Sequence, residues 1–195
     1  MDALTVFTGT VLPLPMRDIN NDVVTPGRFL KMTDRDDARL RLALFHDWRF
    51  FEDGRVRPDF PMNRPDYQGA TILLTGANFG CGSGREKAPW ALLASGFRAV
   101  IATSFAEIFQ SNAFNNGLLP VTLDEPASRA LFAAVAHEPR LDVTIDLPEQ
   151  QVRWRGGKAG FPIDHFWKTC LLRGWDQLDY LLQHTAAIAR FERTR

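Results

Sequence analysis

A glycine-rich stretch constrains this chain more than any other part of its sequence. Residues 76–90 read Gly-Ala-Asn-Phe-Gly-Cys-Gly-Ser-Gly-Arg-Glu-Lys-Ala-Pro-Trp, with glycines at the alternate positions 80, 82 and 84. Residues 71–74 before it form an apolar run typical of a buried strand. Residues 88–94 after it are rich in Ala and Leu, which favours a helix. The sequence therefore predicts a strand, a loop that adopts left-handed backbone conformations, and a helix.

The chemistry of this loop indicates an anion site. One ligand can be contacted by several donors of this loop: the backbone N–H groups of Gly82 and Gly84, the start of the following helix, the Ser83 hydroxyl and the Arg85 guanidinium. Carboxylate and phosphate are the candidate ligands. The dinucleotide-binding pattern fails because it needs glycine where Arg85 stands, and the phosphate-loop pattern lacks Gly-Lys-Ser/Thr. A glycine-rich turn without chemistry is the alternative.

Composition limits the class of protein. With 195 residues, 45% of them hydrophobic, residues 1–195 can form a single domain. The 23 basic and 23 acidic residues cancel and form no basic block, so nucleic acid is not an expected partner. The two cysteines, Cys81 and Cys170, predict a reducing cytoplasm, and they are too few to hold an iron–sulfur cluster. Neither a membrane-spanning apolar run nor a signal pattern is present, so no membrane association is expected.

The remaining patterns predict an α/β fold. Parallel βαβ units are expected from strands at 71–74, 97–102 and 118–123 with helices between them, the second helix being capped by Ser104 with Glu107. Elsewhere the patterns predict a strand at 4–12 ended by Pro13, a helix at 126–137, a β-hairpin at 141–155, a helix capped by Asp164 and a final helix at 176–193.

Three polar segments have alternative interpretations. Residues 17–26 are a polar turn that runs into a short apolar stretch, and they are either an Asx-type turn or part of a site. Arg64 lies in a loop rich in Pro, Asn and Asp, where it is either solvated or binds a substrate carboxylate. His46 and Asp47 are adjacent, but neighbours on a helix rarely face each other, so we expect no catalytic pair and place Trp48 and Phe50 in the core.

The stretch from Asn78 to Leu92 resembles the signature of the 3-isopropylmalate dehydratase small subunits, which correspond to the swivelling domain of the aconitase superfamily. That pattern runs Gly-x-Gly-Ser-Ser-Arg-Glu-His-Ala, whereas here Gly84 replaces the second serine and Lys87 the histidine. Residues 45–50, 104–109 and 115–121 are also similar to the family, so the resemblance covers nearly the whole chain.

The resemblance implies a swivelling β/β/α fold, with parallel βαβ units, a β-hairpin and C-terminal helices. It also implies a heterodimer or heterotetramer with a large subunit that carries a [4Fe–4S] cluster, so that this chain itself binds no metal. Ser83 would be the base acting on a 2-hydroxy diacid, with Arg85 and Asp22 beside it. From the residues themselves, Gly82 and Gly84 are the expected substrate contacts of the glycine-rich loop, and Arg64 joins them in the alternative in which it is not solvated. The expected reaction interconverts 2-isopropylmalate and 3-isopropylmalate through 2-isopropylmaleate, in leucine biosynthesis.

Four departures from the family pattern leave two alternatives open. Gly84 and Lys87 differ in one functional loop, and Asn20 and Asn21 stand in the other where the family has Asp-Thr before Asp22. The chain could be a paralogous small subunit that acts on another alkyl-, aryl- or methylmalate, similar to homoaconitase or citraconate hydratase. It could also be a non-catalytic binding subunit that keeps the fold.

Overall fold

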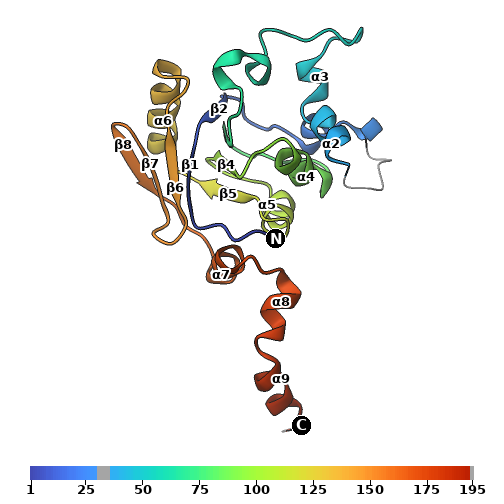
Figure 1. The fold of residues 1–195 in the computed structure, drawn as a ribbon, viewed down its shortest axis with the longest axis vertical. Helices are drawn as coiled ribbons and strands as arrows, with labels where there is room; N and C mark the ends of the chain where they lie inside the picture. The colour runs from blue at the N-terminus through green and yellow to red at the C-terminus, as the bar shows by residue number, and fades with distance from the viewer. Residues whose placement is uncertain (30–35, 194–195) are drawn as a thin grey trace.

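The computed structural model describes residues 1–29 and 36–193, and two four-stranded sheets form its framework (Figure 1). The first sheet is parallel, in the order β2 (Val11–Leu14), β3 (Ile72–Thr75), β4 (Ala99–Ala102) and β5 (Leu119–Thr122). The second sheet is antiparallel, in the order β1 (Val6–Gly9), β6 (Val143–Asp146), β7 (Gln151–Trp154) and β8 (Gly157–Gly160).

Two consecutive βαβ units build the parallel sheet, as the sequence predicts. Helix α4 (Lys87–Ala94) joins β3 to β4, and α5 (Glu107–Asn115) joins β4 to β5. Every residue of β3 and β4 is buried, because helices and the rest of the fold cover both faces of these strands. Figure 1 shows α4 and α5 beside the parallel sheet, whereas α6 (Glu125–His137) lies next to the antiparallel strands. The buried apolar side chains of both sheets form one cluster.

The segment between β2 and β3 forms short helices. These are α1 (Asn21–Val24), η1 (Gly27–Phe29), α2 (Asp37–Ala43), α3 (His46–Arg49), η2 (Pro61–Asn63) and η3 (Pro65–Tyr67). As expected, His46 does not pair with Asp47, since His46 Nδ1 lies 3.0 Å from Leu42 O and Asp47 pairs with Arg28.

The core position expected for Trp48 and Phe50 is only partly right, because both are half-buried. The fully buried ring is Phe45, which has a left-handed backbone (φ 49°) between α2 and α3 and stacks on Trp48. Part of the charged segment before α2 lies outside the described residues.

The strand predicted at residues 4–12 is wrong, because the structure divides it between the two sheets. Strand β1 pairs with β6, and β2 pairs with β3. Gly9 stands at the crossing, where a Cβ would collide with the Thr71 hydroxyl. Pro13 lies inside β2 and does not end the strand. Proline is tolerated there because β2 is an edge strand, and Pro120 in the opposite edge strand β5 is placed in the same way.

The predicted Ser104 cap is also wrong. Helix α5 begins at Glu107 with Ala106 as its N-cap, and no side chain caps it. Residues beyond β4 first pair with the glycine-rich segment, since Phe79 and Phe105 form a parallel bridge and Ala106 N donates to Phe79 O at 3.0 Å. Ser104 Oγ instead accepts a hydrogen bond from Asn78 N at 2.8 Å. Tertiary pairing therefore delays the start of the helix.

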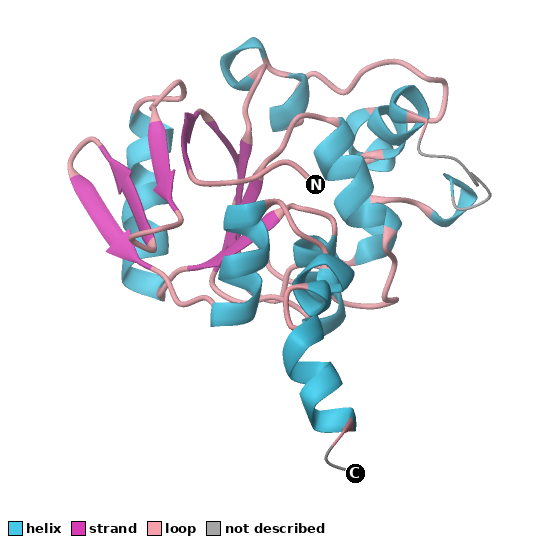
Figure 2. Cartoon of the chain, turned by 60° about the horizontal axis from the view of Figure 1, so that its bottom comes forward, coloured by secondary structure: helices cyan, strands magenta, loops and turns pink. Residues whose placement is uncertain are grey.

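The C-terminal region is helical, but it is divided. Asp164 caps α7 (His165–Arg173) as predicted, by accepting from Phe166 N. The single helix expected at 176–193 is two helices, α8 (Gln177–Leu182) and α9 (Thr185–Glu192). At the break, the Thr185 hydroxyl donates to Leu182 O, a side-chain bond that competes with the helical pattern. Figures 1 and 2 show these helices projecting from the body, and neither contains a buried residue.

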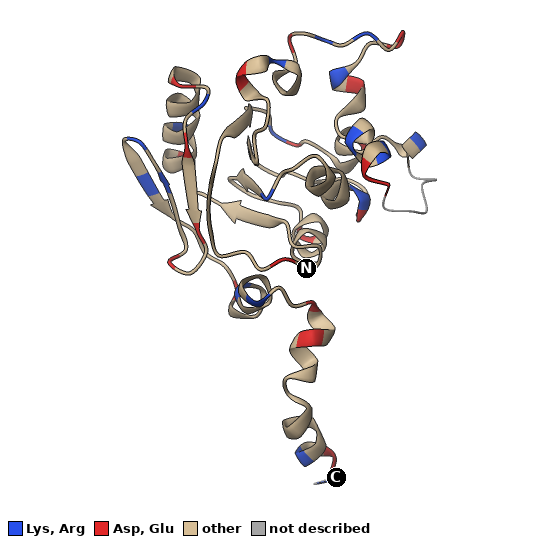
Figure 3. Ribbon diagram, viewed as in Figure 1, with Lys and Arg blue, Asp and Glu red and all other residues tan. Residues whose placement is uncertain are grey.

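The antiparallel sheet extends the predicted hairpin. Strands β6 and β7 confirm it, and β8 adds a third strand at residues for which the sequence analysis predicts no element. Both signs of charge are interspersed over the described helices and loops (Figure 3). Within the described ranges, no helix is long and apolar enough to cross a membrane.

Candidate active site

The candidate site lies beyond the carboxyl ends of three adjacent parallel strands. The segments that follow β2 and β3 remain hydrogen-bonded to each other, with Gly80 N donating to Ile19 O at 2.8 Å. After β3 and β4, Phe79 pairs with Phe105. Ligands of open parallel sheets bind at this edge, because loops from neighbouring strands converge there. The glycine-rich loop and the segment of Asp22 are therefore brought together although 61 residues separate Ser83 from Asp22.

Glycine is required in the loop for two reasons, a left-handed backbone and a lack of space for a side chain. Gly80 and Gly82 have left-handed backbones (φ 78° and 81°), as predicted, and a Cβ on Gly80 would collide with the Phe109 ring. Gly84 has no positive φ, but its Cβ would lie 2.5 Å from Ile108 Cγ2. A serine at position 84, as in the family pattern, would need Ile108 to move. The departure at Gly84 thus accompanies the packing of Ile108.

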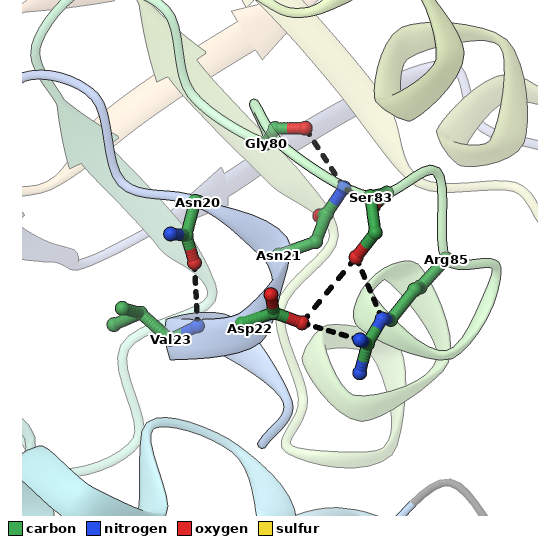
Figure 4. Close-up of polar contacts among 7 residues, drawn as sticks. All are labelled: Asn20, Asn21, Asp22, Val23, Gly80, Ser83 and Arg85. Atoms are coloured by element: carbon green, nitrogen blue, oxygen red, sulfur yellow. Dashed lines mark hydrogen bonds and ion pairs between the residues drawn. The ribbon is translucent and has the colours of Figure 1, made fainter. Parts of the chain in front are cut away.

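Ser83, Arg85 and Asp22 form one hydrogen-bonded group (Figure 4). Arg85 Nε donates to Ser83 Oγ at 2.7 Å, and Ser83 Oγ donates to Asp22 Oδ1 at 3.3 Å. Arg85 Nη2 lies 2.7 Å from the same Asp22 oxygen. The Arg85 side chain is 23% exposed and that of Asp22 is 51% exposed, so the group faces solvent at the surface of this chain.

Arg85 has one donor group that is not satisfied. Its Nη1 is buried and has no hydrogen-bond partner in the described structure. The backbone of Gly27 lies close by, since a Cβ there would be 3.6 Å from Nη1. A buried donor without a partner costs about 1–3 kcal/mol, which an incoming oxygen could recover.

The loop also presents backbone donors. The N–H groups of Gly82, Ser83 and Gly84 donate no hydrogen bond within the described structure. All three residues are exposed. Helix α4 begins just beyond, at Lys87, and no side chain caps it. Free N–H groups and an arginine at one exposed place can bind an anion.

Cys81, within the same loop, does not supply a ready nucleophile. Partial burial raises the pKa of its thiol, and the negative charge of Asp18 raises it further. The thiol therefore stays protonated at neutral pH, whereas a thiolate is the reactive form.

The contacts of Asn21 are not predicted by the sequence. This side chain is fully buried, and its Nδ2 donates to Gly80 O at 2.8 Å and to Ser83 O at 2.7 Å. Its neighbour Asn20 caps α1 by accepting from Val23 N at 2.9 Å, which agrees with the predicted Asx-type turn. No local pattern distinguishes the two asparagines, because the contact of Asn21 is made across the fold.

Arg64 lies apart from the group formed by Ser83, Arg85 and Asp22. Its guanidinium pairs with Asp66 at 2.9 Å and lies over the Tyr67 ring, with 47% of its side chain exposed. Among the described residues it has no hydrogen bond or ion pair with that group. Of the six candidate site residues, the structure therefore brings five together and leaves Arg64 elsewhere.

The donor set of this chain does not fit a metal cluster. No three His, Cys, Asp or Glu residues gather at a metal-binding geometry within residues 1–29 and 36–193. Cys81 lies in the glycine-rich loop and Cys170 is buried in α7. An iron–sulfur cluster normally takes three or four thiolates, so any cluster would need a partner chain.

Similarity to known proteins shows the family to which the chain belongs. A family model of the aconitase C-terminal domain matches residues 1–126. The 3-isopropylmalate dehydratase small subunit of Roseiflexus sp. (strain RS-1) is 49% identical over 196 residues, covering 100% of this chain and 95% of that protein. The small subunit of Chloroflexus aggregans is 50% identical over 193 residues (98% and 94%), and that of Anaeromyxobacter sp. (strain K) is 48% identical over 195 residues (98% of each).

A solved structure has the same fold. The crystal structure of 3-isopropylmalate dehydratase from Methanocaldococcus jannaschii matches with a TM-score of 0.65 at 24% identity, over 95% of this chain and 98% of that one. The expected α/β fold of the aconitase type, with a parallel sheet, an antiparallel sheet and helices, is thereby confirmed. The chain belongs to the family of 3-isopropylmalate dehydratase small subunits, within the aconitase superfamily.

Proposed function

We propose that this chain is the small subunit of a heteromeric hydro-lyase that interconverts 2-isopropylmalate and 3-isopropylmalate through 2-isopropylmaleate. The observation that carries the proposal is the Ser83–Arg85–Asp22 group at the carboxyl edge of the parallel sheet. Three named small subunits are 48–50% identical to this chain over nearly its full length, which supports isopropylmalate as the substrate. The reaction is a step of leucine biosynthesis.

Ser83 is the proposed base. As an alkoxide, Oγ takes the proton from the carbon next to a substrate carboxylate while the neighbouring C–O bond breaks, and the departing hydroxide takes a proton from solvent to become water. In the return step Oγ–H gives its proton to the other carbon, while a water molecule adds its hydroxide to the adjacent carbon and releases its remaining proton to solvent. A free serine hydroxyl is too weak an acid for this, so the site has to stabilise the alkoxide.

Arg85 supplies that stabilisation from a fixed position. Its Nε already donates to Ser83 Oγ at 2.7 Å, and this charge-assisted bond strengthens when Oγ becomes negative. Asp22 holds the guanidinium through Nη2 and so keeps Nε directed at Oγ. The free N–H groups of Gly82 and Gly84 and the unsatisfied Nη1 of Arg85 are then donors for a substrate carboxylate.

The partner is proposed to be a large subunit with a [4Fe–4S] cluster, as a heterodimer or heterotetramer. When bound, the cluster would supply a Lewis-acid iron for the substrate hydroxyl and a carboxylate. The exposed Ser83–Arg85–Asp22 group would face that partner, so that the substrate is enclosed between two chains. We place the complex in the cytoplasm, where the free thiols of Cys81 and Cys170 are stable.

The second candidate function is that of a paralogous small subunit that acts on another malate. The departure from the family pattern at Gly84 favours this candidate. Gly84 stands where the family pattern has serine, and Ile108 fills the space that its side chain would take, so the surface there is apolar. An apolar surface favours an alkyl or aryl side group over a polar one. Retention of Ser83, Arg85 and Asp22 in bonding geometry argues against a non-catalytic subunit.

Reconstitution tests the proposal. The chain is combined anaerobically with a cluster-bearing large subunit, and conversion of 2-isopropylmalate is compared with that of methyl- and arylmalates at equal complex concentration. We expect isopropylmalate to have the highest kcat/KM. A higher kcat/KM for another malate would transfer the function to the paralogue, and turnover of none of them would contradict catalysis.

A further inference from the structure

Asn21 joins the helix that carries Asp22 to the loop that carries Ser83. The Asn21 side chain is 0% exposed, and its amide nitrogen donates to Gly80 O at 2.8 Å and to Ser83 O at 2.7 Å. Its backbone N–H donates to Cys81 O at 2.9 Å. One residue thus makes three hydrogen bonds to the loop, next to the carboxylate that binds Arg85 and Ser83 (Figure 4).

The bond to Ser83 O has no substitute. It is the one hydrogen bond that a backbone group of residues 82–84 makes in the described structure. Ser83 stands between Gly82 and Gly84, and glycine is the residue with the most backbone freedom. A loop of this composition does not hold a side chain in place by itself, so the position of Ser83 depends on a restraint from outside the loop.

We infer that Asn21 is a positioning residue, which fixes the Ser83 backbone so that Oγ meets Arg85 and Asp22; this rests on the proposed role of Ser83. Both atoms facing Nδ2 are carbonyl acceptors, so only the NH₂ side of an amide satisfies them. Leucine has a similar size and no donor, and threonine has a single donor. Asparagine at position 21 therefore has a function, although it departs from the family pattern.

The effect on catalysis follows from geometry. Arg85 Nε and Asp22 Oδ1 lie 2.7 Å and 3.3 Å from Oγ, and a shift of the Ser83 backbone would lengthen both contacts. Misplacing a reacting group by about 1 Å can cost on the order of a hundredfold in rate. The loss falls on kcat more than on KM, because the proposed substrate donor Arg85 Nη1 lies outside residues 82–84. The N–H groups of Gly82 and Gly84 shift with Ser83, which gives the smaller change in KM.

Thr25 provides a matched control on the same short segment. It is also 0% exposed and follows α1, but its Oγ1 has no hydrogen-bond partner in the described structure. Thr25→Val removes a buried polar atom without removing a bond to the loop. Asn21→Leu removes the two bonds to Gly80 and Ser83.

The experiment measures the accessibility of the loop and the rate of the reaction separately. In the isolated chain, the alkylation rate of Cys81 by iodoacetamide is followed by mass spectrometry, with Cys170 (1% exposed) as an internal reporter of global unfolding. In the assembled enzyme, kcat and KM for 2-isopropylmalate are measured per assembled complex. The variants are Asn21→Leu, Asn21→Thr and Thr25→Val.

For Asn21→Leu we expect faster alkylation of Cys81 with Cys170 unchanged, and a kcat lower by roughly 10- to 100-fold with a smaller change in KM. Asn21→Thr should lie between wild type and Asn21→Leu, and it replaces that variant if the leucine protein does not fold. Thr25→Val should match wild type in both measurements.

Wild-type Cys81 reactivity and kcat in both Asn21 variants would overturn the inference. Equal losses in Thr25→Val, or alkylation of Cys170 in step with Cys81, would overturn it as well, since they indicate general destabilisation. If the wild-type complex does not convert isopropylmalate while Asn21→Leu still exposes Cys81, the proposed substrate fails and the positioning role of Asn21 stands.

Discussion

At the residue scale, the site combines a weakly acidic hydroxyl with one arginine that both orients it and bears the compensating charge. Ser83 Oγ accepts from Arg85 and donates to Asp22, so its proton and its lone pair are both already directed. The same arginine is tied to Asp22. Each of the three side chains therefore limits the freedom of the other two, which is the preorganisation that charge stabilisation requires.

Replacing Ser83 tests the base directly. Ser83→Ala should lower kcat of the assembled enzyme by about 100- to 10,000-fold, the usual loss for a general base, while circular dichroism and binding to the large subunit stay unchanged. Steady-state assays on gel-filtered complex provide the measurement. Turnover within about threefold of wild type would remove Ser83 from this role.

Arg85→Lys separates shape from charge. Lysine keeps the positive charge but cannot face Ser83 and Asp22 together, because an ammonium lacks the planar fork. We expect kcat to fall by roughly 100-fold, as for loss of one donor to a developing oxyanion. The kinetics of the assembled variant measure this, and an unchanged rate would show that charge alone suffices.

Arg64→Leu tests the one candidate that lies apart from the group. Arg64 is 47% exposed and paired with Asp66, so its replacement should change stability by no more than about 0.5 kcal/mol and leave isopropylmalate turnover unaltered. Urea unfolding and kcat/KM for isopropylmalate and for a malate with an additional carboxylate provide the comparison. Selective loss of the more anionic substrate would restore Arg64 as a specificity residue.

At the element scale, a local set of polar contacts closes the turn between two neighbouring strands. At the turn of the β6–β7 hairpin, Asp146 accepts from Glu149 N and from Arg153 Nη2, each at 3.0 Å. The backbone N–H of Glu149 is the larger cause and Arg153 the next favourable one, and together they lower the pKa of Asp146. The hairpin thus has a charged cap whose contribution depends on pH.

The sign of that dependence follows from the lowered pKa. The contribution of ionised Asp146 is present above its unfolded pKa of about 3.9 and is lost as pH falls through the lower folded value. Asp146→Asn should therefore have a lower Tm than wild type at pH 7, and the difference should narrow as the pH approaches 3. Thermal unfolding of both proteins across this range measures it, and a constant difference would contradict the assignment.

At the scale of the whole molecule, the proposed function divides the catalytic groups between this chain and a large subunit. Donors for an anion lie at its surface, whereas its two cysteines occupy different elements. We expect the isolated chain to be colourless and to lack turnover of any 2-hydroxy diacid, since it cannot hold a cluster. Absorption spectra after anaerobic treatment with iron and sulfide measure the first expectation. Turnover by the purified chain in the presence of a chelator would contradict the second.

Local patterns were sufficient for the elements whose stability is local. The buried runs of β3 and β4, the amphipathic α6, the hairpin β6–β7 and the Asp164 cap all follow from side-chain period and capping chemistry. The glycine-rich loop was likewise predictable, because the left-handed conformations of Gly80 and Gly82 are a property of the residue itself. Similarity to a known family then supplied the roles expected of Ser83 and Arg85.

Tertiary structure alone decided the rest. The division of residues 4–12 between two sheets, and the start of α5 beyond Ser104, depend on which strands pair. The contacts of Ser83 with Asp22 and of Asn21 with Ser83 each span about sixty residues. Such contacts arise because parallel strands bring their carboxyl ends to one edge, a consequence of topology that no local run of sequence contains.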